Sequence, residues 1–148
     1  RRATRVLARH RVALEVPADL PLVHIDAALF EQALFNLLDN AAKYAPAGSL
    51  VRIRAGRTAD SVVVEVEDEG EGIPADQLER IFDKFHRAHE GDGRPVGTGL
   101  GLSICRGFIE GIGGRVVAAN RSDRPGARFT ITLPIQAAAV AERVQDKV

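Results

Sequence analysis

Apolar residues recur along the chain with two different periods, which divide it into predicted helices and strands. Between Asp26 and Pro46 they recur every three or four positions with no Pro or Gly among them, which predicts an amphipathic helix over about 27–44. Asp26 is a suitable N-cap, because its carboxylate can accept hydrogen bonds from the first free amides. The apolar stripe that we expect to face the core consists of Phe30, Leu34, Leu37, Leu38 and Ala41.

Alternation with a period of two predicts strands in the first half of the chain. In the segment 12–16 every second residue is Val or Leu, which predicts a half-buried strand that stops at Pro17. The segment 51–56 alternates in the same way, and a valine-rich run over 62–66 follows it after a turn, so the two segments are expected to form a hairpin.

The second half of the chain carries fewer apolar positions before its next regular element. Pro74 suits the first turn of a helix over about 75–82. The charged stretch 85–97 contains Gly and Pro and has no periodicity, so a mobile loop is expected there. The remaining predicted elements are a helix over about 99–111 and strands over about 115–119 and 127–133.

The order of these elements predicts an α+β fold. Strand, helix, strand pair, helix, loop, helix and strand pair fit a two-layer α/β sandwich, with one mixed sheet covered by helices on one face. We expect the domain to cover 11–135, with 1–10 as the end of an upstream linker and 136–148 as an appended tail.

Composition narrows the class of protein. The 148 residues are 45% hydrophobic and suffice for one domain with its own core. The chain has 20 basic residues (Lys and Arg) and 20 acidic residues (Asp and Glu), so its formal net charge is zero. The chain as a whole therefore has no electrostatic attraction for nucleic acid or an anionic membrane. No apolar run is long enough to span a bilayer. Because the chain has no methionine and begins at Arg1, we expect it to be a piece of a longer protein.

The single cysteine, Cys105, excludes an internal disulfide. Its helical spacing from Leu102, Ile109 and Ile112 predicts that it packs in the core and takes no part in thiol chemistry.

A polar stripe runs beside the apolar stripe of the helix over 27–44. Gln32, Asn36, Asn40 and Lys43 follow the spacing that places side chains on one helix face. An Asn side-chain oxygen is a neutral, hard ligand for Mg²⁺, and a lysine one turn away supplies positive charge for phosphate. Taken alone, the stripe fits a metal and phosphate site and a solvated helix face equally well.

An acidic, glycine-containing turn over 68–73 follows the predicted hairpin. The Asp68 carboxylate can accept a hydrogen bond from an exocyclic amine such as that of adenine, and Gly70 and Gly72 would let a flat base approach the backbone. The alternatives are an acidic surface turn and a calcium loop. Calcium fits poorly, because the alternating ligands and the closing Glu of an EF-hand loop are missing.

A glycine-rich hexapeptide, 97–102, opens the helix predicted over 99–111. Free amides at a helix start bind phosphate, and alternating glycines permit close backbone approach. A dinucleotide-binding turn is disfavoured because a charged loop, and not a strand, precedes the hexapeptide. A Walker P-loop is disfavoured because no Gly-Lys-Ser/Thr follows.

Two aromatic and two basic residues precede this hexapeptide. Phe82 and Phe85 are expected to anchor the base of the loop in the core, which would let Lys84 and Arg87 swing toward a phosphate. For the two basic residues a solvated loop is an equally good interpretation.

The order of these motifs resembles the catalytic and ATP-binding domain of bacterial sensor histidine kinases, over about 11–135. Residues 36–44 resemble the N box of that family, 68–72 its G1 box, 82–85 its F box and 97–102 its G2 box. The amino-acid sequence after the G2 box is most similar to that of the potassium-responsive Kdp-type sensor kinases, so potassium sensing by the full-length protein is expected.

The resemblance implies a Bergerat-type ATP-binding fold with a left-handed crossover, and ATP and Mg²⁺ as its cofactors. It implies that Asp68 holds adenine and that Asn40 binds Mg²⁺. Lys43 would contact phosphates, Thr130 would order water near the base, and 85–96 would form a lid over ATP. The implied ATP-binding residues are Asn36, Asn40, Lys43, Tyr44, Asp68, Gly70, Gly72, Ile73, Phe85, Gly97, Thr98, Gly99, Leu100, Gly101, Leu102 and Thr130. The residues implied for catalysis are Asn36, Lys43, Lys84 and Arg87.

Asn36 separates the histidine kinases from their relatives. In the gyrase, Hsp90 and mismatch-repair ATPases the matching residue is usually Glu, which can activate a nucleophile, whereas Asn cannot act as a general base. The expected consequence is slow hydrolysis, which leaves the γ-phosphoryl group for a histidine on another domain. His89 and Glu90 imitate an acceptor dipeptide, but the Gly and Pro residues that follow cannot continue the helix that an acceptor needs.

The resemblance therefore implies a protein-histidine kinase catalytic domain without its phosphoacceptor. Its partners would be a histidine-containing dimerisation domain of the same full-length protein and a response regulator, with no nucleic acid and no membrane contact by this piece. The full-length protein is expected to be a homodimer anchored in the inner membrane, with this domain in the cytoplasm. Two alternatives stay open: a nucleotide-sensing interaction module without phosphoryl transfer, and a self-sufficient ATPase of the gyrase and Hsp90 group.

Overall fold

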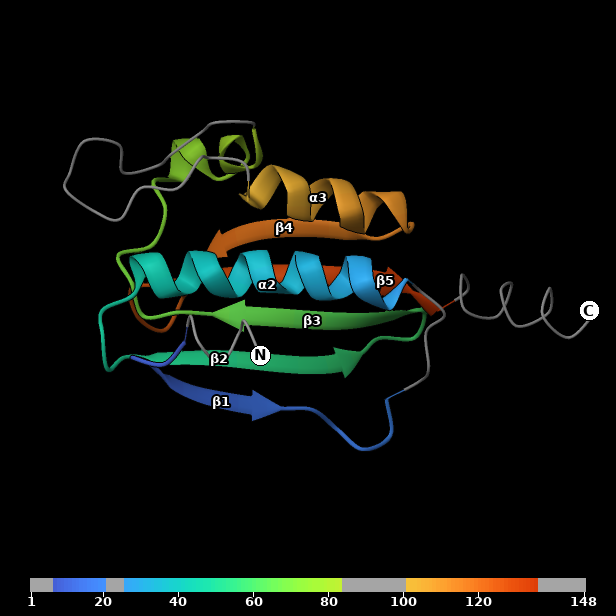
Figure 1. Cartoon of the computed structure of the whole chain (residues 1–148), viewed down its shortest axis with the longest axis horizontal. Helices are drawn as coiled ribbons and strands as arrows, with labels where there is room; N and C mark the ends of the chain where they lie inside the picture. Colours follow the sequence, from blue (N-terminus) through green and yellow to red (C-terminus); the bar gives the residue numbers. More distant parts are fainter. Residues whose placement is uncertain (1–6, 21–25, 84–100, 136–148) are drawn as a thin grey trace, which may run out of the picture.

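The computed structural model describes residues 7–20, 26–83 and 101–135. Within them a five-stranded sheet has the order β1-β2-β3-β5-β4, and α2 and α3 lie side by side on one face of it (Figure 1). β1 runs parallel to β2, and the other neighbouring strands are antiparallel. This is the predicted α+β sandwich. Its elements are β1 (Arg11–Glu15), α2 (Ala27–Tyr44), β2 (Leu50–Arg57), β3 (Ser61–Glu67), the 3₁₀ helices η1 (Ala75–Gln77) and η2 (Arg80–Phe82), α3 (Gly101–Gly111), β4 (Arg115–Asn120) and β5 (Ala127–Pro134).

Helix α2 has the bounds that the sequence predicts. Asp26 caps it by accepting hydrogen bonds from the amides of Ala28 at 3.0 Å and Leu29 at 3.2 Å, which satisfies two of the free donors at the helix start. The helix ends where Ala45 becomes extended before Pro46. The buried residues of α2 are Ala33, Leu37, Leu38 and Ala41, while Phe30 and Leu34 are partly buried against the same core.

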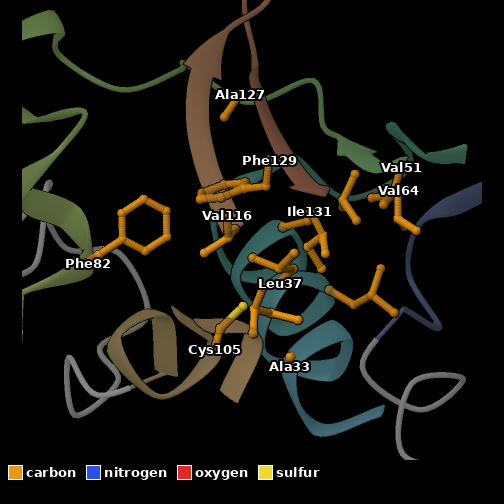
Figure 2. Close-up of a cluster of buried hydrophobic side chains, with 14 of the residues drawn as sticks. Ala33, Leu37, Val51, Val64, Phe82, Cys105, Val116, Ala127, Phe129 and Ile131 are labelled. Carbon is orange, nitrogen blue, oxygen red and sulfur yellow. The ribbon is translucent and has the colours of Figure 1, made fainter. Parts of the chain in front are cut away.

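The core fills the space between the helices and the sheet. In Figure 2, Leu37 of α2 and Cys105 of α3 point toward Phe129 and Ile131 of β5. The Phe82 ring meets Phe129 edge to face, with 6.2 Å between ring centroids. Burial raises the pKa of the Cys105 thiol to about 12, so this residue stays a neutral core side chain, as expected.

The other face of the sheet carries ion pairs. Glu67 is only 4% exposed and has guanidinium nitrogens of Arg52, Arg54 and Arg128 within 3.5 to 3.6 Å of its carboxylate. Three positive groups around one buried carboxylate offset the cost of removing that charge from water. Alternating arginines along β2 therefore belong to a cross-strand charge ladder, and the apolar core lies entirely on the helix side.

The prediction of a half-buried strand at 12–16 is wrong in its burial. Val12 is 48% and Leu14 67% exposed, and Val16 lies beyond the end of the strand. Their register with Val51 and Ile53 puts Val12 and Leu14 on the helix side of the sheet. However, β1 is the edge strand, and α2 lies over the strands farther in (Figure 1). Alternation thus identified the strand, but only the position of α2 decided what it buries.

A second difference concerns the helix predicted over 75–82, where the structure has the two 3₁₀ turns η1 and η2. Their hydrogen bonds, from Gln77 to Pro74 and from Asp83 to Arg80, span three residues. So short a helix has little stability by itself, and the burial of Ile81 and Phe82 determines the backbone conformation of this segment.

The segment just before β1 packs on the domain. Leu7 is 7% exposed and belongs to the core, and the His10 ring nitrogen Nε2 lies 3.1 Å from the Ala45 carbonyl oxygen. Some of the residues expected to be linker therefore contact the fold. The predicted loop at 85–97, the first residues of the helix predicted at 99–111 and the tail at 136–148 lie outside the described residues. In the part of the chain that is described, no helix has the length and apolar character needed to cross a membrane.

Two leucines test this arrangement directly. Leu37→Ala should lower the free energy of unfolding by about 2–5 kcal/mol, because it opens a cavity in the core. Leu14→Ala, the matched control at an exposed edge, should change it by less than about 0.5 kcal/mol. Urea unfolding of both variants would show this difference, and equal losses would contradict the burial described above.

Candidate functional site

Several elements end together at one end of the sheet, on the left in Figure 1. There the C-terminal ends of α2, β3 and β4 lie near the start of α3, and a loop over 68–73 follows β3. The loop touches α2 directly, since a Cβ added to Gly70 would lie only 2.7 Å from the Tyr44 carbonyl oxygen. The structure therefore brings together two motifs that are distant in sequence, the polar helix face ending at Tyr44 and the acidic turn beginning at Asp68.

Asp68 is the buried acid of this loop, with 4% of its surface exposed. Its Oδ1 accepts hydrogen bonds from the amides of Gly70 at 2.9 Å and Ala127 at 3.2 Å. No described residue donates a hydrogen bond to its other oxygen, Oδ2. One oxygen thus fixes the carboxylate, and the other can accept from a ligand.

The pKa of the Asp68 carboxyl is raised above its ordinary value, chiefly because burial penalises the charged form. The hydrogen bonds from Gly70 and Ala127 and the positive charge of Arg121 oppose this increase without cancelling it. A buried acid with a raised pKa is typical of a functional position.

The hairpin between β4 and β5 holds both ends of the loop. Arg121 donates from Nη1 to the Asp68 carbonyl oxygen at 3.1 Å. Gly126 has a φ of +146°, and a Cβ there would clash with that same oxygen. At the other end, Asn120 pairs with the backbone of Ile73. Local periodicity does not predict these contacts, because residues 120–126 lie between the strands predicted over 115–119 and 127–133.

The two loop glycines serve contacts within the protein. Besides the close approach of Gly70 to Tyr44, Gly72 has a φ of +86°, and a Cβ there would lie 2.7 Å from the Asn120 side-chain oxygen. The sequence suggested that these glycines let a base approach the backbone. Close packing against Tyr44 and Asn120 within the protein explains them as well.

The polar stripe of α2 contains one unpaired buried group. Gln32 donates to the Asn36 side-chain oxygen at 3.0 Å, whereas the Asn36 amide nitrogen is buried without a hydrogen-bond partner among the described residues. The Lys43 ammonium lies 3.0 Å from the Asp39 carboxylate, and both side chains are about one-third exposed. Asn40 is half-buried one turn beyond Asn36.

These side chains fit a magnesium–phosphate group better than a metal held by protein alone. The described residues contain no cluster of three or more His, Cys, Asp or Glu able to hold a metal. Mg²⁺ often keeps waters and takes phosphate oxygens as ligands, so it needs few protein donors. The Asn40 side-chain oxygen could be one such donor. The unpaired Asn36 amide could donate to a phosphate oxygen.

The expectation for Thr130 is wrong in its placement. Thr130 is paired with Glu65, three residues along β5 from the Ala127 that bonds Asp68, a separation of about 10 Å. Its neighbours Phe129 and Ile131 face the core, so Thr130 faces the opposite side of the sheet. The residue of β5 at the loop is Ala127.

The remaining predicted site residues divide into two groups. Gly101 opens α3 at the same end of the sheet, and Leu102 packs against the core. The others lie outside the described residues, so their roles stay predictions: Lys84, Phe85, Arg87, Gly97, Thr98, Gly99 and Leu100.

Comparison with known proteins agrees with this geometry. Residues 25–137 match the family described as histidine kinase-, DNA gyrase B-, and HSP90-like ATPase. The chain is 42% identical over 135 residues to the sensor protein KdpD of Escherichia coli K12, covering 91% of the chain but 15% of that protein. Among solved structures it is similar to the mycobacterial sensor histidine kinase MprB, with a TM-score of 0.78 and 28% identity over 90% of this chain and 88% of that one.

A second similar structure is full-length ShkA in complex with AMPPNP. Its TM-score is 0.73, with 29% identity over 90% of this chain and 27% of that one.

The raised pKa of Asp68 predicts a signed effect of pH on stability. Between the unfolded value of about 3.9 and the higher folded value, the folded chain binds more protons, so acidification through this window favours folding and a rise in pH removes that contribution. Asp68→Asn keeps an acceptor for Gly70 and Ala127 but does not titrate. The unfolding free energy of the unaltered chain minus that of Asp68→Asn should therefore increase as pH falls from about 7 to about 4, measured by urea unfolding. A difference that stays constant or decreases would contradict the raised pKa.

Proposed function

This chain belongs to the histidine kinase-, DNA gyrase B-, and HSP90-like ATPase family, and from that membership we propose that it binds ATP with Mg²⁺ and presents the γ-phosphoryl group to a histidine on another domain. It spans only 15% of the length of the sensor protein KdpD that it matches, so the acceptor would lie in the rest of a larger protein. The similarity to KdpD supports a potassium-responsive two-component system as the setting.

The observation that supports this proposal most strongly is the burial and hydrogen bonding of the Asp68 carboxylate. Two backbone amides hold one oxygen of this buried carboxylate, and no described residue donates to the other, so the group is arranged to accept a hydrogen bond in a fixed direction. The exocyclic amine of adenine is a donor of the right kind. Guanine carries a carbonyl oxygen at the equivalent position, which the carboxylate would repel, so the same group would select ATP over GTP.

Residues of α2 would hold the phosphates. The Asn40 oxygen would ligate Mg²⁺, which when bound neutralises charge on the phosphate oxygens. Lys43 is exposed enough to exchange its pairing with Asp39 for a phosphate at small cost, because exposed ion pairs contribute little to stability.

Asn36 supports transfer over hydrolysis. Its side-chain oxygen already accepts from Gln32, and an amide cannot remove a proton from water. A histidine nitrogen from the dimerisation domain would attack the γ-phosphorus, the bond to the β–γ bridging oxygen would break, and ADP would leave. The phosphohistidine would then supply an aspartate of a response regulator.

The test combines the chain with the dimerisation domain of its full-length protein and γ-labelled ATP. The chain alone should bind ATP without acquiring stable acid-labile label, and label should appear on the added domain. Asp68→Asn should weaken ATP binding by about tenfold or more, because a hydrogen bond to a charged group is lost and an amide donor faces the adenine amine.

Three outcomes would count against this function. Stable label on the isolated chain would show an acceptor within it. Tight ATP binding without transfer to the added domain would favour the nucleotide-sensing module. Rapid ATP turnover by the chain alone would favour the gyrase and Hsp90 group of ATPases.

Removal of magnesium tests the role of Asn40. Chelation should lower the ATP affinity of the unaltered chain, and Asn40→Ala should abolish most of this magnesium-dependent gain. The exposed Glu31→Ala on the same helix serves as the control and should keep it. Calorimetric titration with and without Mg²⁺ measures the gain, and an Asn40→Ala variant that keeps it would exclude Asn40 as the ligand.

A further inference from the structure

The loop over 68–73 leaves the sheet at Glu67 and has no strand partner of its own beyond Asp68, so something else must hold its far end. That end is Ile73, one of the residues that the family resemblance implies for ATP binding. The side chain of Asn120, the last residue of β4, meets it there.

The Asn120 amide pairs with both backbone groups of Ile73. Its Oδ1 accepts from the Ile73 N–H at 2.7 Å, and its Nδ2 donates to the Ile73 carbonyl oxygen at 2.7 Å. A side-chain amide carries one acceptor and one donor side by side, so it can bond a residue much as a neighbouring strand would. Two short bonds to one residue fix its orientation as well as its position.

The neighbouring residues are adapted to this contact. Gly72 has a positive φ of +86°, and any Cβ there would lie 2.7 Å from Asn120 Oδ1. The other end of the loop is held separately, since Arg121 bonds the Asp68 carbonyl oxygen at 3.1 Å. Loss of the Asn120 amide would therefore release the Ile73 end alone and leave Asp68 in place.

We propose that Asn120 is a positioning residue for adenine recognition, holding Ile73 and the end of the 68–73 loop against the base that Asp68 selects. This inference rests on the proposed ATP site. Asn120 lies 47 positions from Ile73 in the chain. In this role it would not contact the phosphates.

The contact is at the surface, which makes it testable without disturbing the core. Asn120 is exposed and lies at a strand end, so its replacement should leave the melting temperature nearly unchanged. Asn120→Ala removes both bonds. Asn120→Asp has the same shape and similar turn preference, but it loses the donor and sets a carboxylate oxygen against the Ile73 carbonyl.

Binding of ATP and of GTP to the 148-residue chain would be measured for the unaltered protein, both variants and the control Ser122→Ala, an exposed residue of the same hairpin. Asn120→Ala should weaken ATP binding by about five- to tenfold and GTP binding by less than about twofold, which lowers the preference for ATP. Asn120→Asp should lower the ratio of ATP to GTP affinity by a similar factor, because its added charge acts on both nucleotides and cancels in this ratio. Ser122→Ala should match the unaltered chain.

Other results would overturn the inference in distinguishable ways. An unchanged ATP preference in both variants would exclude the positioning role while leaving the proposed function intact. An equal loss of ATP and GTP affinity would show a general structural effect and would exclude it as well. Failure of the unaltered chain to bind ATP would overturn the proposed function, and this inference with it.

Discussion

The arrangement of the site depends on one buried carboxylate. Asp68 follows β3, and its Oδ1 accepts from an amide of its own loop and from the Ala127 amide of β5. A charge in so buried a place is tolerated only with hydrogen bonds, and these bonds tie the loop to the next strand. Gly126 and Arg121 are needed because the Asp68 carbonyl must approach the hairpin closely. A single acid thereby organises the loop, the start of β5 and the hairpin before it.

Glu67 and Asp68 show how neighbouring acids acquire different roles. Both are 4% exposed, but different groups surround them. Three arginines surround Glu67, so its charge is committed to the ladder that holds β2, β3 and β5 together. Asp68 is held by backbone amides at one oxygen only, and burial still raises its pKa. Glu67 is occupied by the arginines around it, whereas Asp68 has an oxygen to which no described residue donates, so Asp68 is the acid available to a ligand.

Much of the fold follows from local pattern. The helix over 27–44 is confirmed because its N-cap, its apolar stripe and its lack of Pro and Gly all agree. The strands predicted over 51–56 and 62–66 are confirmed within one residue at each end, since alternation in the first and the β-branched valines of the second both favour a strand. The prediction of one helix over 75–82 is wrong, because so short a segment has little intrinsic preference and the tertiary contacts of Phe82 determine its form.

The sequence by itself determined the kinds of chemistry present: the amides and lysine along one face of α2, the acid after β3, and an order of motifs that identifies the family. Side-chain type and spacing are properties of the chain, so they can be read before it folds. Only the tertiary structure decided what these groups touch. It placed Tyr44 against Gly70, turned Thr130 to the far side of the sheet, exposed Leu14 at an edge and joined Asn120 to Ile73. Such contacts depend on strand order and on how far α2 extends across the sheet, and local periodicity contains neither.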